Sequence, residues 1–166
     1  MRIITLNANG IRSAAGKGLF DWFKRQRADV LCLQETRAER EQLVDAHYFP
    51  RGWHVHYHVA RSKRGYSGVA IYARREPDAV FDTLGWAPFD EEGRYLELRF
   101  GQLSVVSLYL PSGSSSEERQ AFKYRVLEWL TPKLAEWRAS GREYVLCGDW
   151  NIAHKPIDLR NWRTNQ

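Results

Sequence analysis

Several features of common protein classes are missing from this sequence. Only two of its 166 residues are cysteine, Cys32 and Cys147, and their spacing is not that of a metal site. Both lie within apolar runs, which indicates core residues in a reducing compartment. The N-terminal segment lacks a cationic stretch followed by a long apolar one, so it is not typical of a signal peptide, and no apolar run has membrane-spanning length. We therefore expect a cytoplasmic protein without a membrane partner.

The sequence also lacks the motifs of several enzyme classes. It has no glycine-rich nucleotide loop, no HExxH zinc motif and no serine nucleophile elbow. Internal repeats, low-complexity tracts and linkers are missing as well. A chain of this length without a linker is expected to form a single domain over residues 1–166.

Positive charge and aromatic side chains are what the chain has in excess. The 25 Lys and Arg residues outnumber the 20 Asp and Glu residues, which gives a net charge of +5. A modest basic excess favours a polyanionic partner. The seven Trp, eight Tyr and seven Phe residues could fill a core or line a binding surface. Trp129 and Trp137 lie on a predicted helix, where we expect them to pack rather than to stack on bases.

Short apolar runs predict strands that alternate with helices, which favours the α/β class. A first helix is indicated by Leu19, Phe20 and Phe23. Thr36 and Glu39 have capping-box spacing, which predicts a helix over residues 37–47. The predicted strands cover residues 2–6, 28–36, 54–60, 68–73, 95–100, 103–110 and 143–147, and the last of these reads as fully buried.

A second capping-box pattern, Ser115 with Glu118, precedes a long amphipathic helix. Phe122, Val126, Leu130 and Leu134 recur along it every four residues. Pro132 lies within this pattern, so we expect the helix to be kinked or split there.

Polar side chains recur where the predicted strands end. Asn7 follows the first strand, Glu35 ends the second, Tyr109 ends the sixth, and Asp149 and Asn151 follow the last. Taken singly, each could be a turn or edge residue. Open α/β sheets, however, gather ligand sites at the carboxyl ends of their strands. Carboxylate oxygens suit magnesium, and amide and phenol groups can hold a phosphate, so the residues predict metal-assisted phosphodiester hydrolysis.

Five stretches resemble, in order, the motifs of the exonuclease III family of abasic-site endonucleases, within the endonuclease–exonuclease–phosphatase superfamily. They are TLNANGIR, LCLQET, GYSGVAIY, YLPSG and GDWNIA. The resemblance implies a four-layered α/β sandwich that cuts DNA on the 5′ side of an abasic site and trims 3′ ends, with Mg²⁺ or Mn²⁺ as cofactor. The implied partner is double-stranded DNA with abasic sites or 3′ ends, and the implied complete enzyme is a monomer.

The resemblance also implies residue roles. Glu35 matches the metal-ligand glutamate and Asn7 the asparagine beside the metal. Tyr109 matches the tyrosine that contacts the scissile phosphate. Asp149 matches the aspartate that orients or activates the attacking water, and Asn151 matches the asparagine that binds the phosphate; both also belong to the implied metal site.

Three further residues are candidate DNA contacts. Arg94 lies where relatives carry a basic residue near the DNA, and Arg64 and Tyr66 lie in a basic loop over residues 61–67. A row of alternating histidines calls for a separate interpretation: His54, His56 and His58 could bind zinc, but such a row is more often a partly solvated strand face. His154 follows the last motif and does not match the family's catalytic histidine.

The chain departs from the family pattern at its end. Members continue well beyond the position of Gln166, and their later metal-site aspartate and paired aspartate and histidine have no match here. We therefore expect residues 1–166 to be the N-terminal part of the domain, with strands of the second sheet missing. Two alternatives stay open: a phosphomonoesterase of the same superfamily, and a truncated, non-catalytic DNA-binding half-domain.

Overall fold

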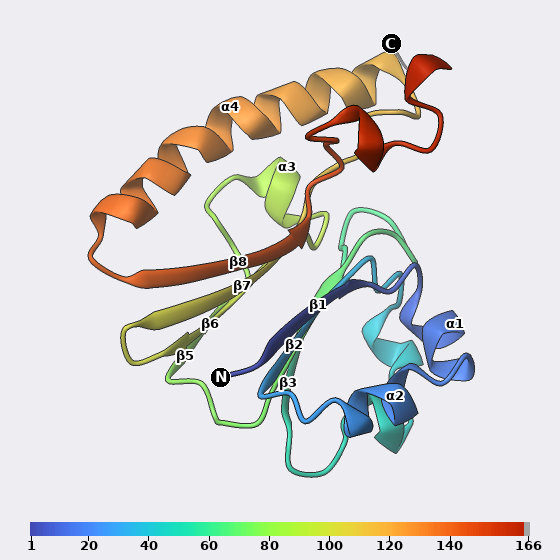
Figure 1. Cartoon of the computed structure of the whole chain (residues 1–166), viewed down its shortest axis with the longest axis vertical. Coiled ribbons are helices and arrows are strands. Elements are labelled where there is room, and N and C mark those ends of the chain that lie inside the picture. Colours follow the sequence, from blue (N-terminus) through green and yellow to red (C-terminus); the bar gives the residue numbers. More distant parts are fainter. Residues whose placement is uncertain (165–166) are drawn as a thin grey trace.

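Two four-stranded sheets face each other in the computed structural model, which describes residues 1–164 (Figure 1). In both sheets one pair of neighbouring strands is parallel, β1 with β2 and β7 with β8, and the other pairs are antiparallel. The first sheet has the order β1 (Ile3–Asn7), β2 (Val30–Gln34), β4 (Val69–Ala73) and β3 (His54–His58). The second has the order β5 (Ala79–Phe81), β6 (Tyr95–Phe100), β7 (Leu103–Tyr109) and β8 (Glu143–Asp149).

Helices cover the outer faces of the two sheets. The helices α1 (Ile11–Gly16) and α2 (Leu19–Arg25) lie on the first sheet, and α3 (Ala87–Asp90) and α4 (Glu117–Ala139) lie on the second (Figure 1). The helix–sheet–sheet–helix order confirms the predicted α/β sandwich. Within the described residues, no helix combines the length and the apolar character that a membrane crossing needs.

The alternation of side chains along each strand divides the core into three layers. On β2, Leu31 and Leu33 pack outward under α2, whereas Val30 and Cys32 pack inward between the sheets. Cys147 of β8 belongs to the same inner cluster, which confirms that both cysteines are core residues. The outer face of the second sheet packs under α3 and α4. Because β2 is covered on both faces, its whole run is buried, as its apolar sequence predicts.

The predicted helix over residues 37–47 is wrong. Only two single 3₁₀ turns occur there, Arg40–Gln42 and Ala46–Tyr48, and the capping box joins Glu39 with Gln42 rather than Thr36 with Glu39. The reason is that the chain after β2 stays paired with the segment before β4. The backbone amides of Thr36 and Arg37 donate to the carbonyls of Gly68 and Ser67, and these bonds replace the helical ones.

The long helix differs from its prediction in two details. The residue that caps α4 is Ser116, whose hydroxyl accepts from the amide of Arg119, so the capping pattern with Ser115 is off by one residue. Pro132 does not split the helix, which continues through it to Ala139. Trp129 packs beside Trp86 and Phe89, as expected for a core aromatic. Trp137 stacks on Tyr144, which confirms the prediction for this tryptophan as well.

Further differences lie at the sheet margins. The last strand is not fully buried: among its residues only Cys147 is, because β8 is the edge strand and pairs with β7 alone. It also extends two residues beyond the predicted end, to Asp149. Three short elements had no prediction, namely α1, α3 and β5. The chain also forms 3₁₀ turns at Pro156–Asp158 and Trp162–Thr164.

Candidate active site at the carboxyl ends of the strands

An open cleft of about 590 Å³ lies at the carboxyl ends of β1 and β2 of the first sheet and of β8 of the second. Strand β1 is the edge of the first sheet, β8 is the edge of the second, and the two are in contact. Asn7, Gln34, Asp149 and Asn151 all line the cleft, so strand ends that are far apart in the sequence contribute to one surface. The predicted clustering of polar strand ends is confirmed for Asn7, Asp149 and Asn151, whereas Glu35 and Tyr109 are not among the residues that line the cleft.

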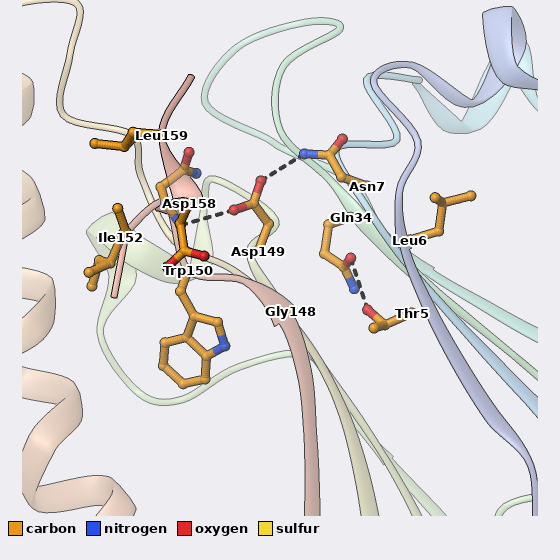
Figure 2. A pocket seen from close by; sticks show the side chains of 12 residues that line it. Thr5, Leu6, Asn7, Gln34, Gly148, Asp149, Trp150, Ile152, Asp158 and Leu159 are labelled. Atoms are coloured by element: carbon orange, nitrogen blue, oxygen red, sulfur yellow. Dashed lines mark hydrogen bonds between the residues drawn. The ribbon is translucent and has the colours of Figure 1, made fainter. Parts of the chain in front are cut away.

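The carboxylate of Asp149 is held from both sheets. One oxygen, Oδ2, accepts a hydrogen bond of 2.8 Å from the side-chain amide of Asn7 on β1. The other, Oδ1, accepts from the backbone amide of Asn151 at 2.9 Å. Figure 2 shows the Asn7 amide directed toward this carboxylate across the cleft. A carboxylate offers about four lone-pair positions, so two remain for other donors.

Asn151 adopts a left-handed backbone conformation with φ of 49°, which is uncommon for a residue other than glycine. Its side-chain Nδ2 donates to the carbonyl of Leu110 at 2.7 Å, and this bond connects the turn after β8 to the end of β7. One N–H of the amide is used in this way, and the second N–H is left for a ligand in the cleft.

Glu35 also has a left-handed backbone, with φ of 58°, directly after β2. It is buried, and its carboxylate accepts a hydrogen bond from the guanidinium of Arg37. The pKa of Tyr109 is raised by burial and then by the negative charge of Glu35, while Arg94 acts in the opposite direction. Glu35 and Tyr109 are therefore electrostatic neighbours, and the phenol keeps its proton at neutral pH.

Arg94 does not agree with its predicted contact to DNA. Only 1% of the residue is exposed, and its guanidinium donates to Glu92, to the backbone carbonyl of Tyr109 and to the hydroxyl of Tyr66. Arg119 binds the same Glu92 carboxylate through two nitrogens and also donates to Tyr66. The guanidinium of Arg94 lies 4.9 Å from the centre of the Tyr109 ring, so this buried ion cluster supports the tyrosine from behind.

The other predicted contacts fall into two groups. Arg64 is exposed and pairs with Glu39, and Tyr66 is half-buried in the same loop, so their contacts to DNA stay predictions. The histidine row is a strand face, as expected. His54 and His56 are partly exposed, whereas His58 is buried, with Nδ1 2.7 Å from the carbonyl of Tyr95.

The sequence did not predict the charged residues that pack against Arg94 and Tyr66 next to the site. Glu92 and Arg119 carry no motif, and only the structure brings them together. Lys123 could have been noticed, because its i, i+3, i+7 spacing to Val126 and Leu130 places a charge on the apolar stripe of the helix.

Comparison with known proteins places this geometry in context. A family model described as Endonuclease/Exonuclease/phosphatase family matches residues 4–166. An exodeoxyribonuclease of Bacillus subtilis (strain 168) is 35% identical over 167 residues, which are 100% of this chain and 64% of that protein. A DNA-(apurinic or apyrimidinic site) endonuclease of Dictyostelium discoideum is 32% identical over 168 residues, which are 100% of this chain and 46% of that protein.

A solved structure of an AP endonuclease from Archaeoglobus fulgidus aligns with a TM-score of 0.76 at 32% identity. The alignment covers 96% of this chain and 61% of that one. The chain thus spans between 46% and 64% of the length of these relatives.

The ion cluster around Glu92 predicts a specific pH dependence of stability. Burial alone would raise the pKa of Glu92, but hydrogen bonds and charge from Arg119 and Arg94 outweigh it and hold the pKa below its ordinary value. As the solution is acidified, the unfolded chain therefore binds more protons than the folded chain does. The stabilisation is therefore complete above the unfolded pKa of about 4.3 and is lost as pH falls through the lower folded pKa.

Glu92→Gln should remove this acid-dependent part and lower the free energy of unfolding at neutral pH by on the order of 3 kcal/mol, because Arg94 is left buried without its counter-charge. Denaturant unfolding between about pH 3 and pH 7 measures both effects. Exposed Glu91 supplies the matched control, and Glu91→Gln should leave the curve unchanged. Superimposable curves for the two variants would show that the cluster does not stabilise the fold.

Proposed function

The chain belongs to the endonuclease/exonuclease/phosphatase family, and from that premise we propose that it carries part of the active site of a DNA-repair nuclease. The proposed reaction is hydrolysis of a phosphodiester bond on the 5′ side of an abasic site, together with trimming of 3′ ends in double-stranded DNA. The observation that carries the proposal is the Asp149 carboxylate, held by Asn7 of one sheet and by the turn after β8 of the other.

The proposed role of Asp149 is to orient the attacking water and to accept its proton. Both carboxylate oxygens already receive one hydrogen bond each, so the group is fixed in position before any substrate arrives. The remaining lone pairs can accept from a water in the cleft. A carboxylate placed in advance in this way avoids reorganisation during the reaction, which is how an active site lowers a barrier.

Two donors are available for the phosphate. The free N–H of the Asn151 amide can bind a phosphate oxygen and stabilise the charge that develops there. The phenol of Tyr109 is the second donor, since a phenol keeps its proton at neutral pH and burial raises the pKa of this one further. The guanidinium of Arg94 donates a hydrogen bond to the backbone carbonyl of Tyr109, and this bond limits the movement of the tyrosine.

The donor chemistry fits a hard divalent cation. Magnesium commonly uses one or two carboxylates together with water and substrate phosphate, and Glu35, Asp149 and the amide oxygens of Asn7 and Asn151 would supply such a set. The carboxylate of Glu35 already binds a cationic group, the guanidinium of Arg37. Within residues 1–164 no group of three or more His, Cys, Asp and Glu side chains forms a preassembled metal cage, which agrees with a site completed by water and substrate. When bound, the ion would polarise the phosphate and lower the pKa of a bound water.

The proposed substrate class is supported by charge and by the relatives. The chain carries a net charge of +5, as suits a polyanionic partner. Proteins similar to it are an exodeoxyribonuclease and an endonuclease for apurinic or apyrimidinic sites. Arg64 and the nearby Lys63 are exposed in the loop before β4 and can contact phosphates without reading sequence.

The decisive experiment is a nicking assay with the protein. The substrate is a labelled duplex with one abasic-site analogue, and Mg²⁺ is added in the presence or absence of a chelator. We expect a single cut on the 5′ side of the lesion that the chelator abolishes. Hydrolysis of a small phosphomonoester with intact DNA would support the phosphatase alternative instead. Binding of the duplex without either reaction would support a non-catalytic half-domain.

Asp149→Asn should separate chemistry from binding. The amide keeps the size of the side chain but cannot accept a proton, so the single-turnover cleavage rate should fall by about 10²–10⁴-fold while DNA affinity stays close to normal. Asp21→Asn, on the exposed face of α2, is the control and should leave both quantities unchanged. If Asp149→Asn weakened binding and retained the cleavage rate at saturating DNA, Asp149 would have a different role.

A further inference from the structure

Lys123 of α4 is a buried cation that has no assigned role. Only 8% of the residue is exposed, and within residues 1–164 no carboxylate forms an ion pair with it. Its Nζ donates instead to two backbone carbonyls, those of Ser112 and Asn151. Burial of an ammonium group is costly unless its hydrogen bonds are satisfied, so a lysine here needs these two acceptors.

The two acceptors belong to different loops of the proposed active site. Ser112 lies three residues after Tyr109, in the loop that leaves β7, and Asn151 lies two residues after Asp149, in the turn that leaves β8. The first loop lies directly on α4 at Gly113, whose φ is 75°. A Cβ atom there would come within 2.2 Å of Gln120 Oε1 and 3.1 Å of Lys123 Cδ. The ammonium group therefore bridges both loops from beneath.

The bond to Asn151 completes a set of three that hold this residue in its left-handed conformation. The backbone N–H donates to Asp149, the side-chain amide donates to the carbonyl of Leu110, and the backbone carbonyl accepts from Lys123. The orientation of the peptide group after Asn151 is fixed only by the last of these contacts. Without it, that peptide group can rotate, and the bonds to Asp149 and Leu110 alone would hold the residue.

We propose that Lys123 is a positioning residue for phosphodiester hydrolysis: it holds the Asn151 carbonyl and thereby aims the Asn151 amide at the phosphate. The inference rests on the proposed function of the cleft. It assigns no contact between Lys123 and the DNA, because both observed bonds of its ammonium group go to backbone carbonyls and the side chain lies on the inner side of the loops. The charge matters because a charged donor binds a carbonyl more strongly than a neutral one.

The test compares the unmodified protein with its Lys123→Met and Lys123→Arg variants. Single-turnover cleavage of abasic duplex DNA at saturation should fall by about 10- to 100-fold in Lys123→Met, the loss typical of a catalytic group displaced by about 1 Å. The affinity for DNA and its dependence on salt should not change. Lys123→Arg should recover most of the rate, because it restores a charged donor. Lys133→Met, on the same helix with only an exposed ion pair, is the matched control.

A double-mutant cycle separates positioning from a general structural effect. Once the amide is removed by Asn151→Ala, adding Lys123→Met should cost little further rate, because the group that it positions is gone. Losses that multiply in the double variant would overturn the proposal, as would an unchanged rate in Lys123→Met. A weaker affinity for DNA, with the slope of log binding constant against log salt concentration smaller by about one, would assign Lys123 to a phosphate contact instead.

Two controls keep the outcome interpretable. Thermal unfolding of each variant confirms that the assay temperature lies below every midpoint. If Lys123→Met does not fold, Lys123→Gln takes its place, and its neutral amide donor should give an intermediate loss. An unmodified protein that fails to cut DNA would refute the proposed function, whereas an active protein with an active Lys123→Met variant would refute only the role of Lys123.

Discussion

The hydroxyl of Ser107, a buried residue of β7, connects the second sheet to β2 of the first sheet. It accepts a hydrogen bond of 2.9 Å from the side-chain amide of Gln34 on β2 and lies 3.0 Å from the carbonyl of Leu33, to which it donates. The hydrophobic effect between the sheets is non-directional, whereas a buried amide and hydroxyl need defined hydrogen-bond partners. The link therefore fixes β2 against β7. The residues at their ends, Glu35 and Tyr109, are consequently electrostatic neighbours.

A second requirement is that the turns after the strands keep their shape without regular secondary structure. Glu35 and Asn151 both have left-handed backbones, which cost free energy and persist only when surrounding bonds determine them. Buried cations supply part of this support. Arg94 donates a hydrogen bond to the backbone carbonyl of Tyr109, and Lys123 donates one to the backbone carbonyl of Asn151. The proposed catalytic groups thus lie on the open side of the cleft, with a charged scaffold on the inner side.

Local sequence predicts the strands and their polar ends well, because alternation and apolar runs report burial directly. It fails where a distant partner decides the structure. Thr36 and Glu39 satisfy the helix-start pattern, but the backbone after β2 pairs with Ser67 and Gly68 instead. The burial of Arg94 could not be predicted either, since two of its hydrogen-bond acceptors, the carbonyl of Tyr109 and the hydroxyl of Tyr66, are distant in the sequence. Strand order across the two sheets is equally non-local.

We propose that this end of the sandwich is a metal-dependent hydrolytic site in which Glu35 supplies one of the anionic ligands. The most direct test is a Mg²⁺ titration of the single-turnover nicking rate in the unmodified protein, Glu35→Gln and the matched control Glu39→Gln, whose carboxylate binds Arg64 outside the cleft. A ligand lost from the site should raise the Mg²⁺ concentration needed for half-maximal rate by about 10- to 100-fold in Glu35→Gln alone. Coincident titrations for all three proteins would contradict the claim.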